Sequence, residues 1–141
     1  MTFLNPNLKL DFSAYIADRT HQFTGREWVF ERVKRWLEDA EGDSPEERLR
    51  QRFFLLTGEP GSGKSAIAAR LTQFAQGTKT YPGLTAGYLH AVHFCSAQDS
   101  TWVDPKDFVR SLALQLAASI PDFALALKDI GEKTNTINEE L

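Results

Sequence analysis

Residues 53–65 read Phe-Phe-Leu-Leu-Thr-Gly-Glu-Pro-Gly-Ser-Gly-Lys-Ser, an apolar run that leads directly into a glycine-rich loop. A short apolar run fits a buried helix or a buried strand, and the glycines that follow it favour the strand. From about Gly63 to Gln76, apolar side chains recur at helical spacing, and those that line one side of the expected helix are Ile67, Leu71 and Phe74. The stretch therefore predicts a buried parallel strand, a loop and a helix in succession.

The loop matches the pattern Gly-x4-Gly-Lys-Ser, the Walker A or P-loop motif. Glycines let the backbone curl so that successive N–H groups point at phosphate oxygens, and the following helix adds its positive N-terminal end. Lys64 is expected to reach the β- and γ-phosphates, and the Ser65 hydroxyl to ligate Mg²⁺. The predicted contact residues are Gly58, Glu59, Pro60, Gly61, Ser62, Gly63, Lys64, Ser65 and Ala66. We therefore expect ATP or GTP with magnesium to bind here, and the alternative is a glycine-rich turn without a ligand.

The residues before the apolar run predict a surface segment followed by one helix. Met1 to Asp18 shows no clear period. Thr24 and Glu27 have the spacing of a capping box, which would open a helix at this point. The apolar residues of that helix fall on one stripe, which consists of Val29, Val33, Trp36, Leu37 and Ala40.

The second half predicts one more strand and two helices. Tyr88–Cys95 has the apolar character of a strand, and Asp104-Pro105 starts a helix well, with Asp at the N-cap and Pro at the first position. The expected buried face of that helix consists of Phe108, Val109, Leu112, Ala113 and Leu116. Pro121 interrupts it, and a shorter helix is expected to follow until Gly131.

Strand, glycine loop, helix, strand and helix in this order predict an α/β fold. We expect the three-layer α/β/α sandwich of P-loop NTPases, with a mostly parallel sheet that this chain leaves incomplete. Its predicted division is an N-terminal extension over residues 1–22, the N-terminal part of a P-loop NTPase domain over 23–130, and a polar tail over 131–141.

Composition argues against several classes of partner. There are 16 basic and 19 acidic residues, a net charge of −3, and no stripe of Lys or Arg, so nucleic acid is not an expected partner. Cys95 is the single cysteine, which fits a reducing compartment. No signal peptide is evident, and no stretch approaches the roughly 18 apolar residues of a membrane span. We expect a cytoplasmic protein that does not contact a membrane.

Several further segments resemble one group of proteins. Phe23-Thr24-Gly25-Arg26-Glu27, a helix ending in Trp36-Leu37, and the spacer before the glycine loop are similar to the start of STAND-type signalling NTPases. His93-Phe94-Cys95, Asp104-Pro105 and the segment 108–116 are similar to the same modules. This group includes NACHT domains, nephrocystin-3-like N-terminal domains and origin-recognition-type AAA ATPase modules. The resemblance covers roughly residues 12–130.

The resemblance implies that Phe23 and Arg26 lie near the adenine and ribose of a bound nucleotide. ATP or ADP is then expected in preference to GTP, and no Asn-Lys-x-Asp guanine motif occurs in the chain. It also implies a switch within a longer parent protein, in which bound ATP or ADP selects a domain arrangement. The implied partners are other domains of that parent or further copies of the chain.

One family feature is missing. These ATPases use a second motif, an apolar strand ending in an acid, and no such acid follows Phe53–Leu56 or Tyr88–Cys95. We therefore identify no catalytic residue, and we expect this chain to bind nucleotide without hydrolysing it, whereas the resemblance implies that the longer parent protein is an ATPase. Two alternatives stay open: a nucleotide-dependent interaction module without turnover, and a small P-loop kinase or GTPase that uses Asp99 for magnesium.

Other chemically suggestive residues have ordinary explanations. His90, His93 and Cys95 are close in sequence, but on a strand His90 falls on the opposite face, so strand residues are favoured over metal ligands. Asp99 and Asp104 are expected to be a loop acid and a helix cap. Glu59 is expected to be solvated. The tryptophans, which are expected to pack and not to stack on bases, are Trp28, Trp36 and Trp102.

Overall fold

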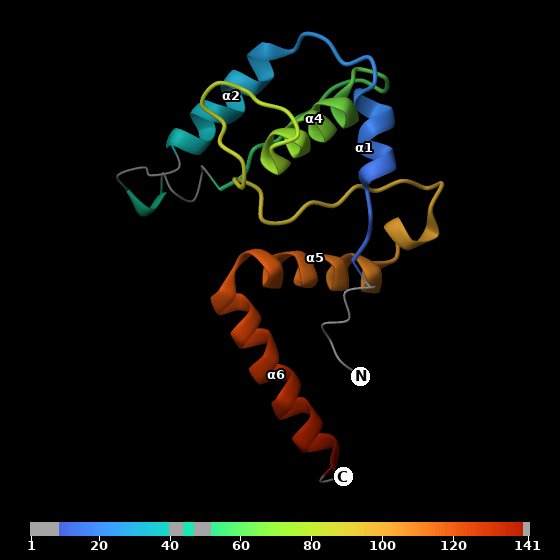
Figure 1. Ribbon diagram of the computed structural model, residues 1–141, viewed down its shortest axis with the longest axis vertical. Helices are drawn as coiled ribbons and strands as arrows, with labels where there is room; N and C mark the ends of the chain where they lie inside the picture. Colours follow the sequence, from blue (N-terminus) through green and yellow to red (C-terminus); the bar gives the residue numbers. More distant parts are fainter. Residues whose placement is uncertain (1–8, 40–43, 47–51, 140–141) are drawn as a thin grey trace. The chain divides into compact units, whose positions relative to one another are not determined.

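The computed structural model describes residues 9–39, 44–46 and 52–139 (Figure 1). Its helices are α1 (Ser13–Thr20), α2 (Glu27–Glu38), α4 (Lys64–Gln76), the 3₁₀ helix η3 (Ser100–Trp102), α5 (Pro105–Ser119) and α6 (Pro121–Glu139). The chain divides into two compact units. The first unit of the chain, residues 13–88, holds α1, α2 and α4, and the second, residues 89–141 with residues 1–12, holds η3, α5 and α6.

The predicted α/β sandwich is wrong for the described residues, which contain no β-strand. Their single β-bridge joins Tyr81 and Leu84, outside both predicted strands. Phe53 and Leu55, expected inside a sheet, are 83% and 84% exposed. A strand is stabilised by a neighbour that pairs its backbone and covers its side chains, and apolar character alone supplies neither.

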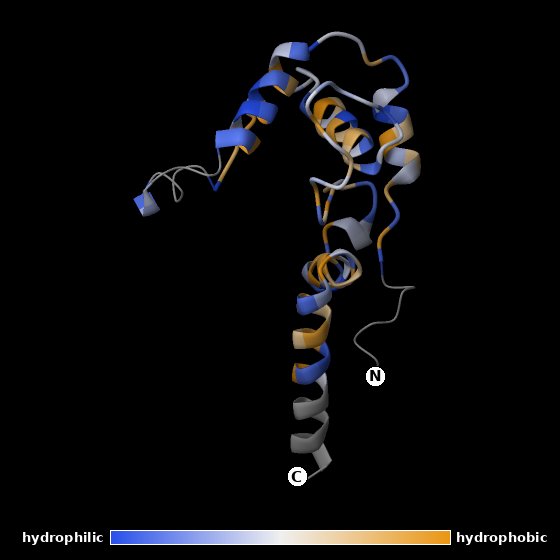
Figure 2. Cartoon of the chain, turned by 60° about the vertical axis from the view of Figure 1, so that its left-hand side comes forward, coloured by the Kyte–Doolittle hydropathy of each residue, from blue (hydrophilic) through white to orange (hydrophobic). Residues whose placement is uncertain are grey.

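The core of the first unit lies between α2 and α4. Its buried residues are Val29, Phe30, Val33, Ile67, Phe74 and Leu84. The predicted faces of both helices are confirmed in large part, because Leu37 and Leu71 also pack against this core. Trp36 instead packs on Phe54, buried Phe30 was not predicted, and Ala40 lies outside the described residues. Figure 2 shows α2 with hydrophilic residues on one side and apolar residues on the other, as expected for a helix packed on a core.

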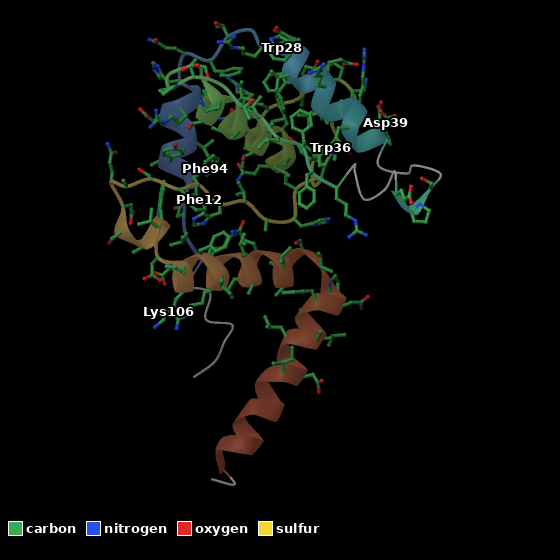
Figure 3. The ribbon with its side chains drawn as sticks, turned by 180° about the vertical axis from the view of Figure 1, so that it is seen from behind. Phe12, Trp28, Trp36, Asp39, Phe94 and Lys106 are labelled. Atoms are coloured by element: carbon green, nitrogen blue, oxygen red, sulfur yellow. The ribbon has the colours of Figure 1, made fainter. Side chains whose placement is uncertain are left out.

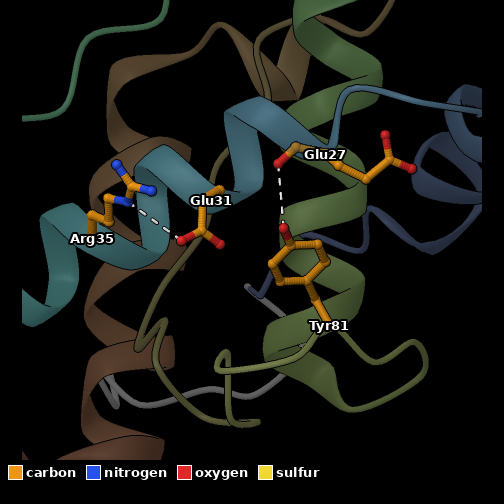
Figure 4. Close-up of polar contacts among 4 residues, drawn as sticks. All are labelled: Glu27, Glu31, Arg35 and Tyr81. Carbon is orange, nitrogen blue, oxygen red and sulfur yellow. Dashed lines mark hydrogen bonds and ion pairs between the residues drawn. The ribbon is translucent and has the colours of Figure 1, made fainter.

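Polar contacts fix the start of α2 within this unit. The Tyr81 hydroxyl donates to the carbonyl of Glu27 (3.3 Å), and an exposed ion pair joins Glu31 and Arg35 (3.3 Å), as Figure 4 shows.

Tyr88 makes a second polar contact in this unit: its hydroxyl donates to the Leu71 carbonyl, and burial raises the pKa of Tyr88 to about 12. The Tyr88 phenol therefore stays protonated throughout the physiological pH range.

Helix α1 was not predicted, and it lies against α4. Only Ile16 and Thr20 of its eight residues are buried, so its sequence carries no helical period. The Thr20 hydroxyl donates to the Ile16 carbonyl (2.7 Å) and accepts from the Gln73 amide of α4 (3.0 Å). Tertiary packing, which a local pattern does not reveal, stabilises so short a helix.

Two predicted helix ends differ from the structure. Helix α2 begins at Glu27, and its N-cap is Arg26, so Thr24 does not form a capping box. Gly25 (φ 74°) and Arg26 (φ 69°) both adopt left-handed backbone, which turns the chain between Thr24 and the helix. Helix α6 passes Gly131 and ends at Glu139, beyond its predicted end. The Asp104 cap of α5 is confirmed, with its carboxylate accepting from the N–H groups of Lys106 and Asp107.

In the second unit, side chains of α5 take the place of a neighbouring strand. The Gln115 amide pairs with both backbone groups of Val92, donating to its carbonyl and accepting from its N–H (3.0 Å each). Ser119 donates to the His90 carbonyl, and Ser111, fully buried, accepts from the N–H of Leu10. Buried backbone groups need partners, and here a helix supplies them, so residues 89–93 form no ladder.

The buried face of α5 therefore differs from the predicted one. Val109 is 59% exposed and Phe108 39%, while Gln115 and Ser119 contact Val92 and His90, and Ser111 contacts Leu10. Aromatic packing instead centres on Phe12, whose ring lies 4.7 Å from Trp102 and 5.4 Å from both His93 and Phe94. Figure 3 shows Phe12 beside Phe94.

Replacement of Gln115 by alanine is expected to destabilise the second unit. It leaves the N–H and carbonyl of Val92 without their partner, at a cost of about 1–3 kcal/mol for each group that stays buried. Amide hydrogen exchange at Val92 should accelerate, as measured by NMR. Gln98→Ala, which removes an exposed amide from the same unit, is the matched control and should leave that exchange unchanged. Unaltered protection of Val92 in Gln115→Ala would contradict the pairing.

Candidate functional site

The glycine-rich loop connects the exposed apolar run to α4. Gly61 (φ 79°) and Gly63 (φ 90°) adopt left-handed backbone, which side-chain-bearing residues rarely occupy. Gly58 is favoured for another reason: a Cβ there would lie 2.7 Å from the Ser62 hydroxyl oxygen, so the Ser62 side chain would have to move. The N–H of Ser62 donates to the Glu59 carbonyl (3.1 Å), which closes the turn. The loop thus ends at Gly63, the N-cap of α4.

Lys64, the first residue of α4, folds its side chain back over this loop. Its ammonium donates to the carbonyls of Gly58 (2.7 Å) and Glu59 (2.8 Å) and lies 3.4 Å from the Ser62 hydroxyl. The cation therefore lies beside the N-terminal end of α4, where unpaired N–H groups also carry partial positive charge. This combination favours an anion with several oxygen acceptors.

A pocket of ≈ 390 Å³ opens beside the first turn of α4. Its lining residues are Asp18, Arg19, His21, Gln22, Phe23, Thr24, Arg26, Gly63 and Ala66. The Arg70 guanidinium lies 5.1 Å from the centre of the Phe23 ring, and this cation–π contact helps to hold the ring in place at the pocket. Arg26 donates to the Ser62 carbonyl (3.3 Å), so a pocket residue also contacts the loop.

The model of one protein family, described as nephrocystin 3, N-terminal, matches residues 25–140. This match spans most of the chain. The chain belongs to the nephrocystin 3 N-terminal family. No curated protein and no solved structure matches it significantly. The nephrocystin-3-like part of the sequence resemblance is thereby confirmed, and the match includes the glycine loop, α2, α4 and α5.

In this chain, the predicted contact residues lie in two adjoining places. Phe23, Arg26, Gly63 and Ala66 line the pocket. Gly58, Glu59, Ser62 and Lys64 form the hydrogen-bonded loop. The remaining predicted residues, which are exposed and line no part of the pocket, are Pro60, Gly61 and Ser65.

The pocket residues that the sequence did not reveal come from α1 and the turn after it. They are Asp18, Arg19, His21 and Gln22, which were assigned to an N-terminal extension and precede the family match. They belong to no motif, and α1 itself has no apolar period. Only the packing of α1 on α4 brings them to the site.

The other suggestive residues of this domain have structural partners. Nε2 of His93 lies 2.8 Å from the Trp102 carbonyl, and the His93 ring packs edge-on against Phe108. The Asp99 carboxylate accepts from the N–H and hydroxyl of Thr101 (2.9 and 2.7 Å), so its prediction as a loop acid is confirmed. Within the part of the chain that the structure describes, no three His, Cys, Asp or Glu side chains are grouped as a metal site.

The tryptophans behave differently from one another. Trp36 packs on Phe54 (5.6 Å between ring centres) and Trp102 on Phe12, as predicted for packing residues. Trp28 is instead 60% exposed near the start of α2, where Figure 3 labels it, so its prediction as a packing residue is wrong. Among the described helices, none is both long and apolar enough to span a bilayer.

Proposed function

We propose that this chain binds ATP or ADP with Mg²⁺, as the nucleotide-binding part of a STAND-like signalling switch. One observation carries the proposal. Phe23 and Arg26, expected near the nucleoside from the resemblance, line the same pocket as Gly63 and Ala66 of the phosphate-loop helix. The pocket volume of ≈ 390 Å³ lies within the range of ligand sites, roughly 300–1,000 Å³.

The residues of the loop fit a magnesium triphosphate. The Lys64 ammonium and the N-terminal end of α4 supply positive charge beside the loop. Ser65 is exposed at the second position of α4 and offers one hydroxyl to the metal, whose other ligands would be water and phosphate oxygens. Bound magnesium would neutralise phosphate charge, and the chain's own part is to hold and orient the phosphates.

Adenine nucleotides are expected to bind more tightly than guanine nucleotides. The chain has no Asn-Lys-x-Asp sequence, whose aspartate reads guanine in many GTPases, and the Phe23–Glu27 segment resembles an adenine-side element. Displacement of a fluorescent ATP analogue by unlabelled ATP, ADP and GTP measures the preference directly. GTP that displaces the analogue as well as ATP does would overturn this assignment.

Turnover is not part of the proposal, because neither of the apolar segments predicted as strands, Phe53–Leu56 and Tyr88–Cys95, ends in an acid. The proposed switch therefore requires nucleotide binding by this chain and does not require hydrolysis. The kinase or GTPase alternative relies on Asp99, whose carboxylate is already paired with Thr101. No observation favours it over nucleotide binding.

The proposed setting follows from the same resemblance. The partners would be other domains of a longer parent protein or further copies of this chain, in the cytoplasm. The near balance of 16 basic and 19 acidic residues supports neither nucleic acid nor an anionic membrane as a ligand.

A further inference from the structure

The walls of the pocket differ in chemistry. On one side lie Gly63, the N-cap of α4, and Ala66 of its first turn, next to the loop that holds the Lys64 ammonium. The other side is built by α1 and its turn, and it carries a carboxylate, a guanidinium, an imidazole and an amide from Asp18, Arg19, His21 and Gln22. One side therefore favours anions, and the other offers both hydrogen-bond donors and acceptors.

The α1 wall is fixed in place by the helix that carries the phosphate loop. Ile16 (5% exposed) and Thr20 (8% exposed) are the buried residues of α1. The Gln73 amide of α4 donates to the Thr20 hydroxyl (3.0 Å). Helix α1 is thus held directly against α4, and this hydrogen bond lies in the last turn of α4. Such preorganisation suits a ligand-binding surface.

Charge decides which part of a nucleotide fits this wall. The Asp18 carboxylate repels phosphate oxygens, which Lys64 and the N-terminal end of α4 attract. The same carboxylate accepts well from N–H and O–H groups, as the uncharged ribose and base provide. The Arg19 guanidinium lies over the Tyr15 ring (5.0 Å), so it does not offset the negative charge of Asp18.

We infer that α1 and its turn form the nucleoside-binding wall of this site, with Asp18 accepting a hydrogen bond from the ribose or the base. This inference rests on the proposed nucleotide binding. It adds residues that lie before the family match and that no motif identifies. The N-terminal segment would then be an integral part of the binding site and not an accessory extension.

Two ligands separate the nucleoside from the phosphates: Mg·ATP and Mg·tripolyphosphate, which has no ribose or base. In Asp18→Ala, we expect the affinity for ATP to fall roughly tenfold, as for loss of a charged hydrogen bond. The affinity for tripolyphosphate should stay unchanged or rise slightly, because a negative charge has been removed. Asp18→Asn, which preserves the size of the side chain, should show the same direction. Calorimetric titration of the folded full chain measures both ligands.

The control is Glu38→Ala, which removes the same charge from the end of α2, outside the pocket. It should change neither affinity beyond about twofold, as expected for a screened surface charge. Unchanged ATP affinity in folded Asp18→Ala and Asp18→Asn would overturn the inference while leaving nucleotide binding intact. Equal changes for ATP and tripolyphosphate would also overturn it, because they would place phosphate beside Asp18. If the unaltered chain binds neither ligand, the proposed function itself is wrong.

Discussion

Lys64→Ala is expected to weaken the binding of Mg·ATP roughly a hundredfold or more while the chain stays folded. The ammonium makes all of its described contacts within the loop, to Gly58, Glu59 and Ser62, and none to the core. Its removal therefore takes a cation from the phosphate site without opening a cavity. Isothermal titration calorimetry measures the affinity, and circular dichroism verifies the helical fold.

The matched control is Lys79→Ala, which removes the same charge from an exposed loop of the same unit. Lys79 lies outside the glycine loop and does not line the pocket. A general electrostatic effect would weaken ATP binding in both variants, whereas a specific phosphate contact affects Lys64 alone. Full affinity in a folded Lys64→Ala chain would refute the phosphate-loop assignment.

Phe30→Ala should cost the first unit about 3–5 kcal/mol of unfolding free energy, as other buried phenylalanines do. Phe30 is 3% exposed, and its ring lies 5.1 Å from that of Phe74, 5.5 Å from Tyr81 and 5.8 Å from Phe23. Truncation to alanine removes the phenyl ring at the centre of this aromatic cluster. Since whole domains are stable by only about 5–15 kcal/mol, the loss should be evident as a lower urea midpoint.

Phe53→Ala is the same substitution at a position that is 83% exposed, and it should change stability by no more than about 0.5 kcal/mol. The comparison distinguishes the helical structure from the α/β sandwich predicted from sequence. In a sandwich, Phe53 would be buried in a central strand, and its truncation would cost as much as that of Phe30. Comparable destabilisation in the two variants would therefore contradict the exposed placement of residues 53–55.

Several helices lie where the sequence predicts them, because local interactions are sufficient to fix their ends. The helix after the loop begins at Lys64 and ends at Gln76, as predicted from its apolar spacing. The Asp104 cap and the break at Pro121 depend on the chemistry of single residues, and both were predicted correctly. Helix α1 was not predicted, because its two buried residues are too few to form a pattern.

The sequence by itself determined the glycine loop with Lys64 and the two apolar helix faces that meet in the core of residues 13–88. These follow from residue type and spacing, which act over one or two helical turns. Only the tertiary structure decided that Val92 pairs with Gln115 and not with another strand, and that α1 brings Asp18 to the pocket of Gly63. Strand pairing and pocket walls join residues far apart in the chain. Both depend on which distant segment packs against a given residue, so local sequence does not specify them.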